Sequence, residues 1–140
     1  MAVRERVVTL VIDASVANSW IFEDESHPRA DAALAEVLNS GGWVTRHWHL
    51  EVRNALLVGE RRGRITPRES SVGLSYLDGL RLQTDAAADL DHVLDLARIY
   101  GLSMYDAMYL ELAVRRHLTL ATLDRGLERA ASAAGIEVLP

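Results

Sequence analysis

A short and almost uninterrupted apolar segment, residues 7–12, lies near the start of the sequence and ends at Asp13. Valine and isoleucine predominate in it, and such a β-branched run is typical of a strand that is buried on both faces. Strands of this kind belong to parallel sheets covered by helices, so the segment favours an α/β fold. It is too short for a membrane span or a signal peptide, which predicts a cytoplasmic protein that does not contact the membrane.

The rest of the chain alternates between helical and extended patterns, and no linker divides it. Helices between strands act as crossovers that join parallel neighbours. We therefore expect one domain, a three-layer α/β/α sandwich with a mostly parallel sheet of about five strands. The predicted helices are residues 15–22, 28–38, 47–60, 66–80, 89–100, 103–117 and 124–134, and the further strands are residues 43–45, 81–85, 118–122 and 136–139.

Two residue types are missing from the 140 residues, cysteine and lysine. The absence of cysteine excludes disulfides, thiolate zinc sites and cysteine nucleophiles. All 15 basic residues are arginine, which excludes a lysine-containing phosphate-binding loop and Schiff-base chemistry. The formal net charge of −5 argues against binding of nucleic acid through bulk basicity, though not through a local arginine patch.

Two acids, Asp13 and Asp124, directly follow predicted strands. In parallel α/β sheets the functional groups gather beyond the carboxyl ends of the strands, which is where both carboxylates would lie. Each also has a plain alternative, because an aspartate before a helix is a common N-cap. Taken singly, either residue is explained by capping.

Two further acids, Glu51 and Asp106, lie on predicted helices. At about 100° per residue, Asp106 falls within the apolar stripe of helix 103–117, and Glu51 falls at the edge of the stripe of helix 47–60. A carboxylate buried there without a partner would be strongly unfavourable. The alternatives are a capping box between Ser103 and Asp106, and a Glu51 side chain that reaches water along a buried face.

Together the four acids predict a metal site. Several ionised carboxylates close together repel one another, and a divalent cation is a natural counter-ion where lysine is absent. Oxygen ligands without cysteine or an evident histidine pair favour Mg²⁺ or Mn²⁺ over zinc. Such a site suits hydrolysis of phosphodiester bonds, because the metal can orient a water and offset charge on the leaving oxygen.

Four motifs follow one another along the chain: Val-Ile-Asp13-Ala-Ser15, Leu50-Glu51-Val-Arg-Asn54-Ala-Leu, Ser103-Met-Tyr105-Asp106-Ala-Met-Tyr-Leu and Leu120-Ala-Thr122-Leu-Asp124. In this order and at this spacing they resemble the PIN-domain ribonucleases, most closely the VapC-type toxins of bacterial toxin–antitoxin modules. The resemblance covers nearly the whole chain, and it implies that residues 1–140 form a single PIN-like nuclease domain.

The resemblance implies a metal-dependent endoribonuclease that forms a homodimer and is inhibited by a cognate antitoxin. It assigns four residues to the Mg²⁺ or Mn²⁺ site, Asp13, Glu51, Asp106 and Asp124. It also implies three supporting residues, Ser15, Asn54 and Thr122. Many relatives have a proline-containing turn before the glutamate, whereas this chain has Arg46-His47-Trp48-His49. Because helical residues two apart face different ways, we expect His47 and His49 to be surface residues and not ligands.

An acidic protein that cleaves RNA needs some basic surface. Arginines cluster after helix 47–60, and those proposed to contact RNA are Arg61, Arg62 and Arg64, with Arg68 nearby. A second group, Arg115 and Arg116, is expected with Glu111 on a solvated polar arc behind Asp106. The apolar group Trp20, Ile21 and Phe22 is interpreted as core packing, or as an antitoxin-binding groove.

Two other classes of function remain open. The chain could be a catalytically silent binding module with a PIN-like fold, in which the acids serve only as caps. It could also be another Mg²⁺-dependent phosphoester hydrolase, such as a phosphatase that forms an aspartyl-phosphate. That chemistry uses a second aspartate two residues after the nucleophile, and Ser15 at this position counts against it. A serine hydrolase is disfavoured, because Gly73-Leu74-Ser75-Tyr76-Leu77 lacks the second glycine of a nucleophile elbow.

Overall fold

The computed structural model describes residues 8–140, and within them four parallel strands form one sheet in the order β3–β2–β1–β4. β1 (Leu10–Ile12) is an inner strand, and all three of its residues are fully buried, as expected for a strand covered on both faces. It is shorter than the predicted segment 7–12, of which Val7 lies outside the described residues. The other strands are β2 (Gly42–Thr45), β3 (Leu82–Asp85) and β4 (Thr119–Ala121).

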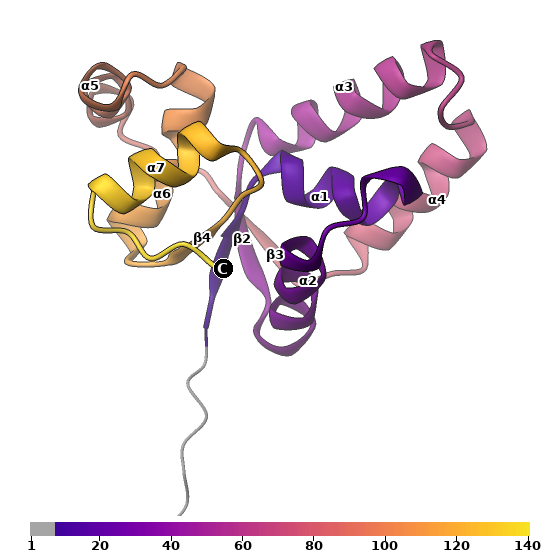
Figure 1. The fold of residues 1–140 in the computed structure, drawn as a ribbon, viewed down its shortest axis with the longest axis horizontal. Helices are drawn as coiled ribbons and strands as arrows, with labels where there is room; N and C mark the ends of the chain where they lie inside the picture. Colours follow the sequence, from indigo (N-terminus) through magenta and orange to yellow (C-terminus); the bar gives the residue numbers. More distant parts are fainter. Residues whose placement is uncertain (1–7) are drawn as a thin grey trace, which may run out of the picture.

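Helices cover both faces of the sheet, which confirms the predicted three-layer α/β/α sandwich. Each predicted helix is present, with its ends within two residues of the predicted ones. α2 packs on β1 and β4 from one side, and α6 packs on β1, β2 and β4 from the other. Figure 1 shows α1 (Ala14–Ile21), α2 (Pro28–Ser40), α3 (Trp48–Arg61) and α4 (Pro67–Asp78) on one side, and α5 (Leu90–Tyr100), α6 (Met104–Arg116) and α7 (Arg125–Ala133) on the other.

Within residues 8–140 the sheet has four strands where about five were predicted, because residues 136–139 do not form a full strand. This segment makes a single parallel bridge, Val138 to Leu120. Two backbone hydrogen bonds accompany it, from Leu120 N to the Glu137 carbonyl and from Leu139 N to the Leu120 carbonyl, both at 2.9 Å. β4 has only three residues, so it offers the last segment a short edge for pairing.

Local signals in the sequence explain where the helices begin and end. Thr66 and Glu69 form the expected capping box, because each side chain accepts a hydrogen bond from the backbone N–H of the other residue at 3.1 Å. α2 ends at Gly41, whose φ of 69° is a left-handed conformation that favours glycine. A Cβ at this position would also lie 2.7 Å from the carbonyl oxygen of Arg81, so the connection to β2 requires glycine for two reasons.

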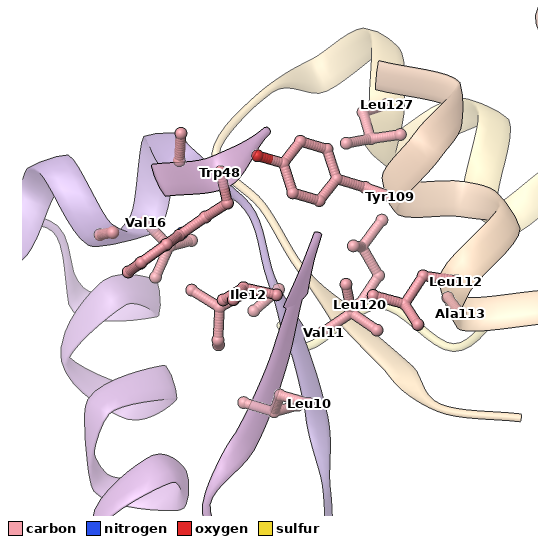
Figure 2. Packing of buried hydrophobic residues seen from close by; sticks show 14 of the residues in the cluster. Leu10, Val11, Ile12, Val16, Trp48, Tyr109, Leu112, Ala113, Leu120 and Leu127 are labelled. Atoms are coloured by element: carbon pink, nitrogen blue, oxygen red, sulfur yellow. The ribbon is translucent and has the colours of Figure 1, made fainter. Parts of the chain in front are cut away.

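The hydrophobic core lies between the sheet and the helices on both sides. Figure 2 shows β1 and β4 side chains meeting those of α1, α6 and α7, among them Ile12, Val16, Leu120 and Leu127. All four of these side chains are fully buried. Since Asp13 directly follows Ile12, the most tightly packed strand of the sheet positions the first of the predicted site residues.

The face of α6 expected to be solvated is instead partly buried, which corrects the sequence-based interpretation of Glu111, whereas the side chains of Arg115 and Arg116 stay 27% and 34% exposed. Glu111 is fully buried, and Arg115 Nε donates to its Oε1 at 2.6 Å. Arg115 and Arg116 both also bind Asp85, the last residue of β3, which is 3% exposed. We call these four residues the Asp85 ion cluster. The sequence showed one apolar stripe on α6, but packing against α5 and the sheet covers the polar side too.

Among the described residues, no helix combines the length and the apolar character that crossing a bilayer requires.

Candidate active site

The four acids predicted from the sequence come together at the carboxyl edge of the sheet. Asp13 follows β1 and Asp124 follows β4, while Glu51 and Asp106 lie in the first turns of α3 and α6. Their charges are coupled: burial raises the pKa of Asp106 and of Asp13 first, and the charges of Asp124 and Glu51 raise that of Asp106 further, as the charge of Glu51 does for Asp13. Residues that are far apart in the sequence therefore share one electrostatic environment.

Asp13 is the most deeply buried of the four, with 4% of its surface exposed. It caps α1, because Oδ1 accepts a hydrogen bond from Val16 N at 3.1 Å, and the same oxygen accepts from the Ser15 hydroxyl at 2.6 Å. Burial raises the pKa of Asp13 to about 6, although the hydrogen bonds from Ser15, Thr122 and Val16 act in the opposite direction. Desolvation thus destabilises the ionised carboxylate more than its hydrogen bonds stabilise it.

The hydroxyls of Ser15 and Thr122 connect Asp13 to the segment after β4. Thr122 donates to Asp13 Oδ2 and accepts from Asp124 N at 3.0 Å, and Ser15 accepts from Leu123 N at 3.0 Å. Asp124 in turn caps α7 by accepting from Leu127 N at 2.8 Å. Both hydroxyls predicted as supporting residues therefore contact the acids, and the capping alternatives for Asp13 and Asp124 are observed as well.

Glu51 is held by two residues that the sequence analysis did not assign to the site, Tyr109 and His47. The Tyr109 hydroxyl donates to Glu51 Oε1 at 2.8 Å. His47 Nε2 also lies 2.8 Å from this oxygen, with its N–H direction poorly aligned. Burial raises the pKa of Glu51, but the contacts with His47 and Tyr109 outweigh it and bring the pKa below its ordinary value.

His47 is a half-buried residue of the site, which corrects the prediction that it lies on the surface. Its Nδ1 is 2.8 Å from the hydroxyl of Thr45 at the end of β2, and its ring centroid is 4.8 Å from that of Tyr109. The reason is that His47 precedes the first turn of α3 and so escapes the helical spacing used in the prediction. His49 is only partly covered, and its Nε2 is 2.8 Å from the Thr84 hydroxyl.

Tyr109 is almost fully buried beneath these acids, and Figure 2 shows its hydroxyl pointing away from α6 toward the segment that carries Trp48. Burial and the neighbouring Glu51 raise the pKa of the phenol, so it acts only as a hydrogen-bond donor to the carboxylate. The sequence carried only a partial signal: Tyr109 lies one helical turn after Asp106 and so on the same side of α6, but this spacing does not pair it with Glu51.

Asp106 is half-buried at the start of α6. Ser103 caps this helix by accepting from Asp106 N at 3.1 Å, which is one half of the expected capping box. The pKa of Asp106 is raised first by burial, then by the charges of Asp124 and Glu51. Its carboxylate is therefore influenced by the charges of two other acids, Asp124 and Glu51.

These residues suit a divalent cation in ligand type and in charge. Carboxylate oxygens are the ligands that Mg²⁺ and Mn²⁺ prefer, and in residues 8–140 no arginine forms an ion pair with any of the four acids. In that same part of the chain, however, no three Asp, Glu or His side chains are close enough to hold a metal ion as they stand. The oxygens would have to approach one another to coordinate one.

The remaining predicted residues do not join the acids. Asn54 is exposed, and within residues 8–140 no hydrogen bond connects it to Glu51. Arg61 and Arg62 are exposed, whereas Arg64 binds Asp24 Oδ1 and Glu25 Oε1 at 3.0 Å each. Arg64 is thus already paired with two carboxylates, and Arg115 and Arg116 belong to the Asp85 ion cluster.

A sequence-family model described as the PIN domain matches residues 10–133. The fold resembles PAE2754 from Pyrobaculum aerophilum, with 26% identity and a TM-score of 0.65 over 88% of this chain and 86% of that chain. It also resembles VapC20 from Mycobacterium tuberculosis, described as a Sarcin-Ricin loop cleaving toxin, with 15% identity and a TM-score of 0.60 over 94% of this chain and 100% of that chain.

A third similar structure is a toxin–antitoxin complex from Klebsiella pneumoniae, with 17% identity and a TM-score of 0.55 over 83% of this chain and 87% of that chain. At these identities the VapC20 and Klebsiella structures support the fold alone. A search of curated proteins found no significant match to the sequence.

Proposed function

This chain belongs to the PIN domain family, and from that premise we propose that it is a VapC-type toxin, an endoribonuclease that depends on Mg²⁺ or Mn²⁺. The observation that supports the proposal best is the convergence of Asp13, Glu51, Asp106 and Asp124 at one edge of the sheet, where no arginine of residues 8–140 forms an ion pair with them. We further propose that residues 1–140 act as a single nuclease domain.

The four acids would hold the divalent ion, which when bound supplies a Lewis acid for a phosphate oxygen and favours deprotonation of water. The chain's own residues prepare these acids for the role. Ser15 and Thr122 fix both oxygens of Asp13. Tyr109 keeps one oxygen of Glu51 in place and so limits its rotation. Loss of such outer contacts typically costs about 10- to 100-fold in metal affinity or activity.

A cognate antitoxin and a second copy of the chain are the protein partners that we propose. One of the similar structures is itself named a toxin–antitoxin complex. This chain has a groove of about 760 Å³ next to the end of α1 and α4, whose lining includes Trp20, Ile21, Phe22, Val72 and Tyr76. Phe22 is part of the core, but Val72 is 67% exposed and Tyr76 is 45% exposed, so the groove leaves apolar surface in water that a partner could cover.

The silent binding module remains the second candidate, because Asp13 and Asp124 do cap their helices. In that case the acids stabilise local structure, and their substitution would change stability without any loss of catalysis. The two candidates differ in what a divalent ion does to the purified protein.

The deciding experiment is an RNA cleavage assay with the purified protein and mixed single-stranded and stem-loop RNAs. We expect cleavage with Mg²⁺ or Mn²⁺, and none with a chelator or in the Asp13→Asn and Asp106→Asn variants. Asp95→Asn, which changes an exposed carboxylate in a surface pair with Arg98, is the matched control and should cleave normally. Cleavage that persists in chelator and in Asp106→Asn would rule out the metal mechanism, and an absence of cleavage by the wild type would favour the binding module.

A further inference from the structure

The first turn of α6 carries an exposed aromatic residue directly beside the acids. Tyr105 precedes Asp106, is 67% exposed, and makes no hydrogen bond through its hydroxyl within residues 8–140. Its ring centroid lies 5.7 Å from that of His47, the residue that contacts Glu51. The tyrosine ring therefore lies beside the ring of His47 at the site, while most of the residue is open to solvent.

The same arrangement recurs on α3. Leu50 precedes Glu51 and is 71% exposed, and Met104 beside Tyr105 is 38% exposed. Each of the two helical acids of the site, Glu51 and Asp106, is thus preceded by a large side chain, Leu50 or Tyr105, that is exposed to solvent in the folded protein. Exposed apolar side chains occur elsewhere on this protein too, but these three are distinguished by their position next to the two helical acids, where a ligand of the acidic site could contact them.

An unpaired RNA base is the ligand whose chemistry fits Tyr105. Proteins recognise single-stranded RNA largely by stacking its splayed bases on aromatic side chains. Such stacking requires an open π-face, and it tolerates any base because every base has one. A base is also uncharged, so it can lie close to the acids without electrostatic repulsion.

On the basis of the proposed function, we propose that Tyr105 is the stacking platform for an unpaired base next to the scissile phosphate. The platform restricts the substrate to RNA whose bases are free to leave the stack, such as loops and single strands. Duplex RNA presents no open base face there and is excluded. Tyr105 contacts the substrate and not the acids, so it governs binding more than the rate of the chemical step.

The first measurement is binding of a fluorescent, unpaired RNA oligonucleotide in Mg²⁺, in the Asp106→Asn background so that no cleavage occurs. We expect Tyr105→Ala to weaken binding by about 10- to 100-fold, in the range that base–aromatic stacking gives. Tyr105→Phe keeps the ring and should bind normally. Leu38→Ala removes another exposed apolar side chain, which lies near the end of α2 and is 59% exposed, and is the matched control. Equal binding by all of these variants would overturn the proposal.

The second measurement is cleavage kinetics with active protein and an RNA that has one cleavage site. An abasic nucleotide is placed in turn at each position around that site. In the wild type, we expect an abasic nucleotide at one of these positions to raise KM and to leave kcat nearly unchanged. In Tyr105→Ala, which has already lost the stacking contact, the same abasic nucleotide should raise KM no further. Abasic penalties that are the same in both proteins would contradict the stacking role.

The two measurements separate this proposal from the function it rests on. If RNA binding depends on Tyr105 but the active protein cleaves no RNA, the nuclease function is contradicted and the stacking role of Tyr105 is supported. If the protein cleaves RNA but binding does not depend on Tyr105, the nuclease function is supported and the stacking role is contradicted. Light scattering of Tyr105→Ala tests whether this exposed surface instead forms an interface between protein chains. A shift to a smaller species with unchanged RNA binding would assign Tyr105 to a protein interface and overturn the proposal.

Discussion

Asp13 combines two roles that conflict at the level of a single residue. Its carboxylate caps α1 and accepts hydrogen bonds from Ser15 and Thr122, which favour the ionised form. Burial and the charge of Glu51 oppose ionisation more strongly, so the pKa of Asp13 rises to about 6. Such a residue stores unfavourable free energy in the folded protein, as is common for groups that bind a ligand or catalyse a reaction.

The conflict predicts a particular dependence of stability on pH when no metal is bound. The folded-state pKa of about 6 lies above the ordinary value of 3.8, so between these values the native state binds more protons than the unfolded state. The contribution of Asp13 to stability is therefore largest below about pH 4 and is lost as the pH rises through 6. The loss is on the order of 3 kcal/mol, at about 1.4 kcal/mol per pKa unit.

Urea unfolding in chelator from pH 4 to pH 8 measures this effect. The free energy of unfolding of the wild type, relative to Asp13→Asn, should fall between about pH 4 and pH 6 and then stay constant. Asparagine keeps the capping oxygen but does not titrate in this range. Parallel curves for the two proteins would mean that Asp13 is not desolvated as described.

At the scale of elements, α6 connects the acidic site to the Asp85 ion cluster. Asp106 and Tyr109 lie toward its N-terminus and reach the site, while Glu111 and Arg115 lie further along and attach the helix to the end of β3. Arg116 adds a cation–π contact, with its guanidinium 3.7 Å from the Trp43 ring centroid. The position of Asp106 thus depends on buried ion pairs elsewhere on the same helix.

Removal of Arg115 should therefore destabilise the fold strongly. Arg115→Met keeps the apolar stem but leaves the carboxylates of Glu111 and Asp85, which are 0% and 3% exposed, with fewer partners. Breaking a buried pair in this way costs about 3–5 kcal/mol. Urea unfolding at neutral pH measures the change. In Arg98→Met, the control, the exposed 3.7 Å pair with Asp95 should account for less than about 1 kcal/mol. Similar losses in the two variants would show that the cluster contributes little.

At the scale of the whole molecule, the acidic site joins the two sides of the sheet. Asp13 and Glu51 come from the side of α1 and α3, and Asp106 and Asp124 from the side of α6 and α7 (Figure 1). A cation held among them would connect both helical layers. It would also offset the repulsion from Asp124 and Glu51, which adds to the effect of burial in raising the pKa of Asp106.

Mn²⁺ should accordingly stabilise the entire fold and not only one segment. A ligand that binds only the native state adds about 2.7 kcal/mol at 100 times its Kd. We expect thermal unfolding monitored by circular dichroism to show a Tm that rises with Mn²⁺ concentration, and an Asp13→Asn/Asp106→Asn double variant to show no rise. If the double variant were stabilised to the same extent, the ion would have to bind elsewhere.

Much of the fold and part of the site could be predicted from local patterns. The apolar run before Asp13, the alternation of helices and strands, and the Thr66–Glu69 capping box depend on neighbouring residues, so the sequence alone determined them. The placement of Asp13 and Asp124 at one edge followed equally from parallel topology. The failure of residues 136–139 to form a full strand could not be predicted in this way, because their pairing depends on the length of β4 in the folded sheet.

Contacts between distant elements were decided only by the tertiary structure. Periodicity identifies one apolar stripe on a helix, but it does not show that a second layer covers the polar side, and so Glu111 was wrongly placed in solvent. It likewise does not indicate that Tyr109 and His47 meet at Glu51, or that Arg64 reaches Asp24 and Glu25. The physical reason is that each of these contacts joins side chains whose distance is set by how helices pack on the sheet, and not by the residues next to them in the chain.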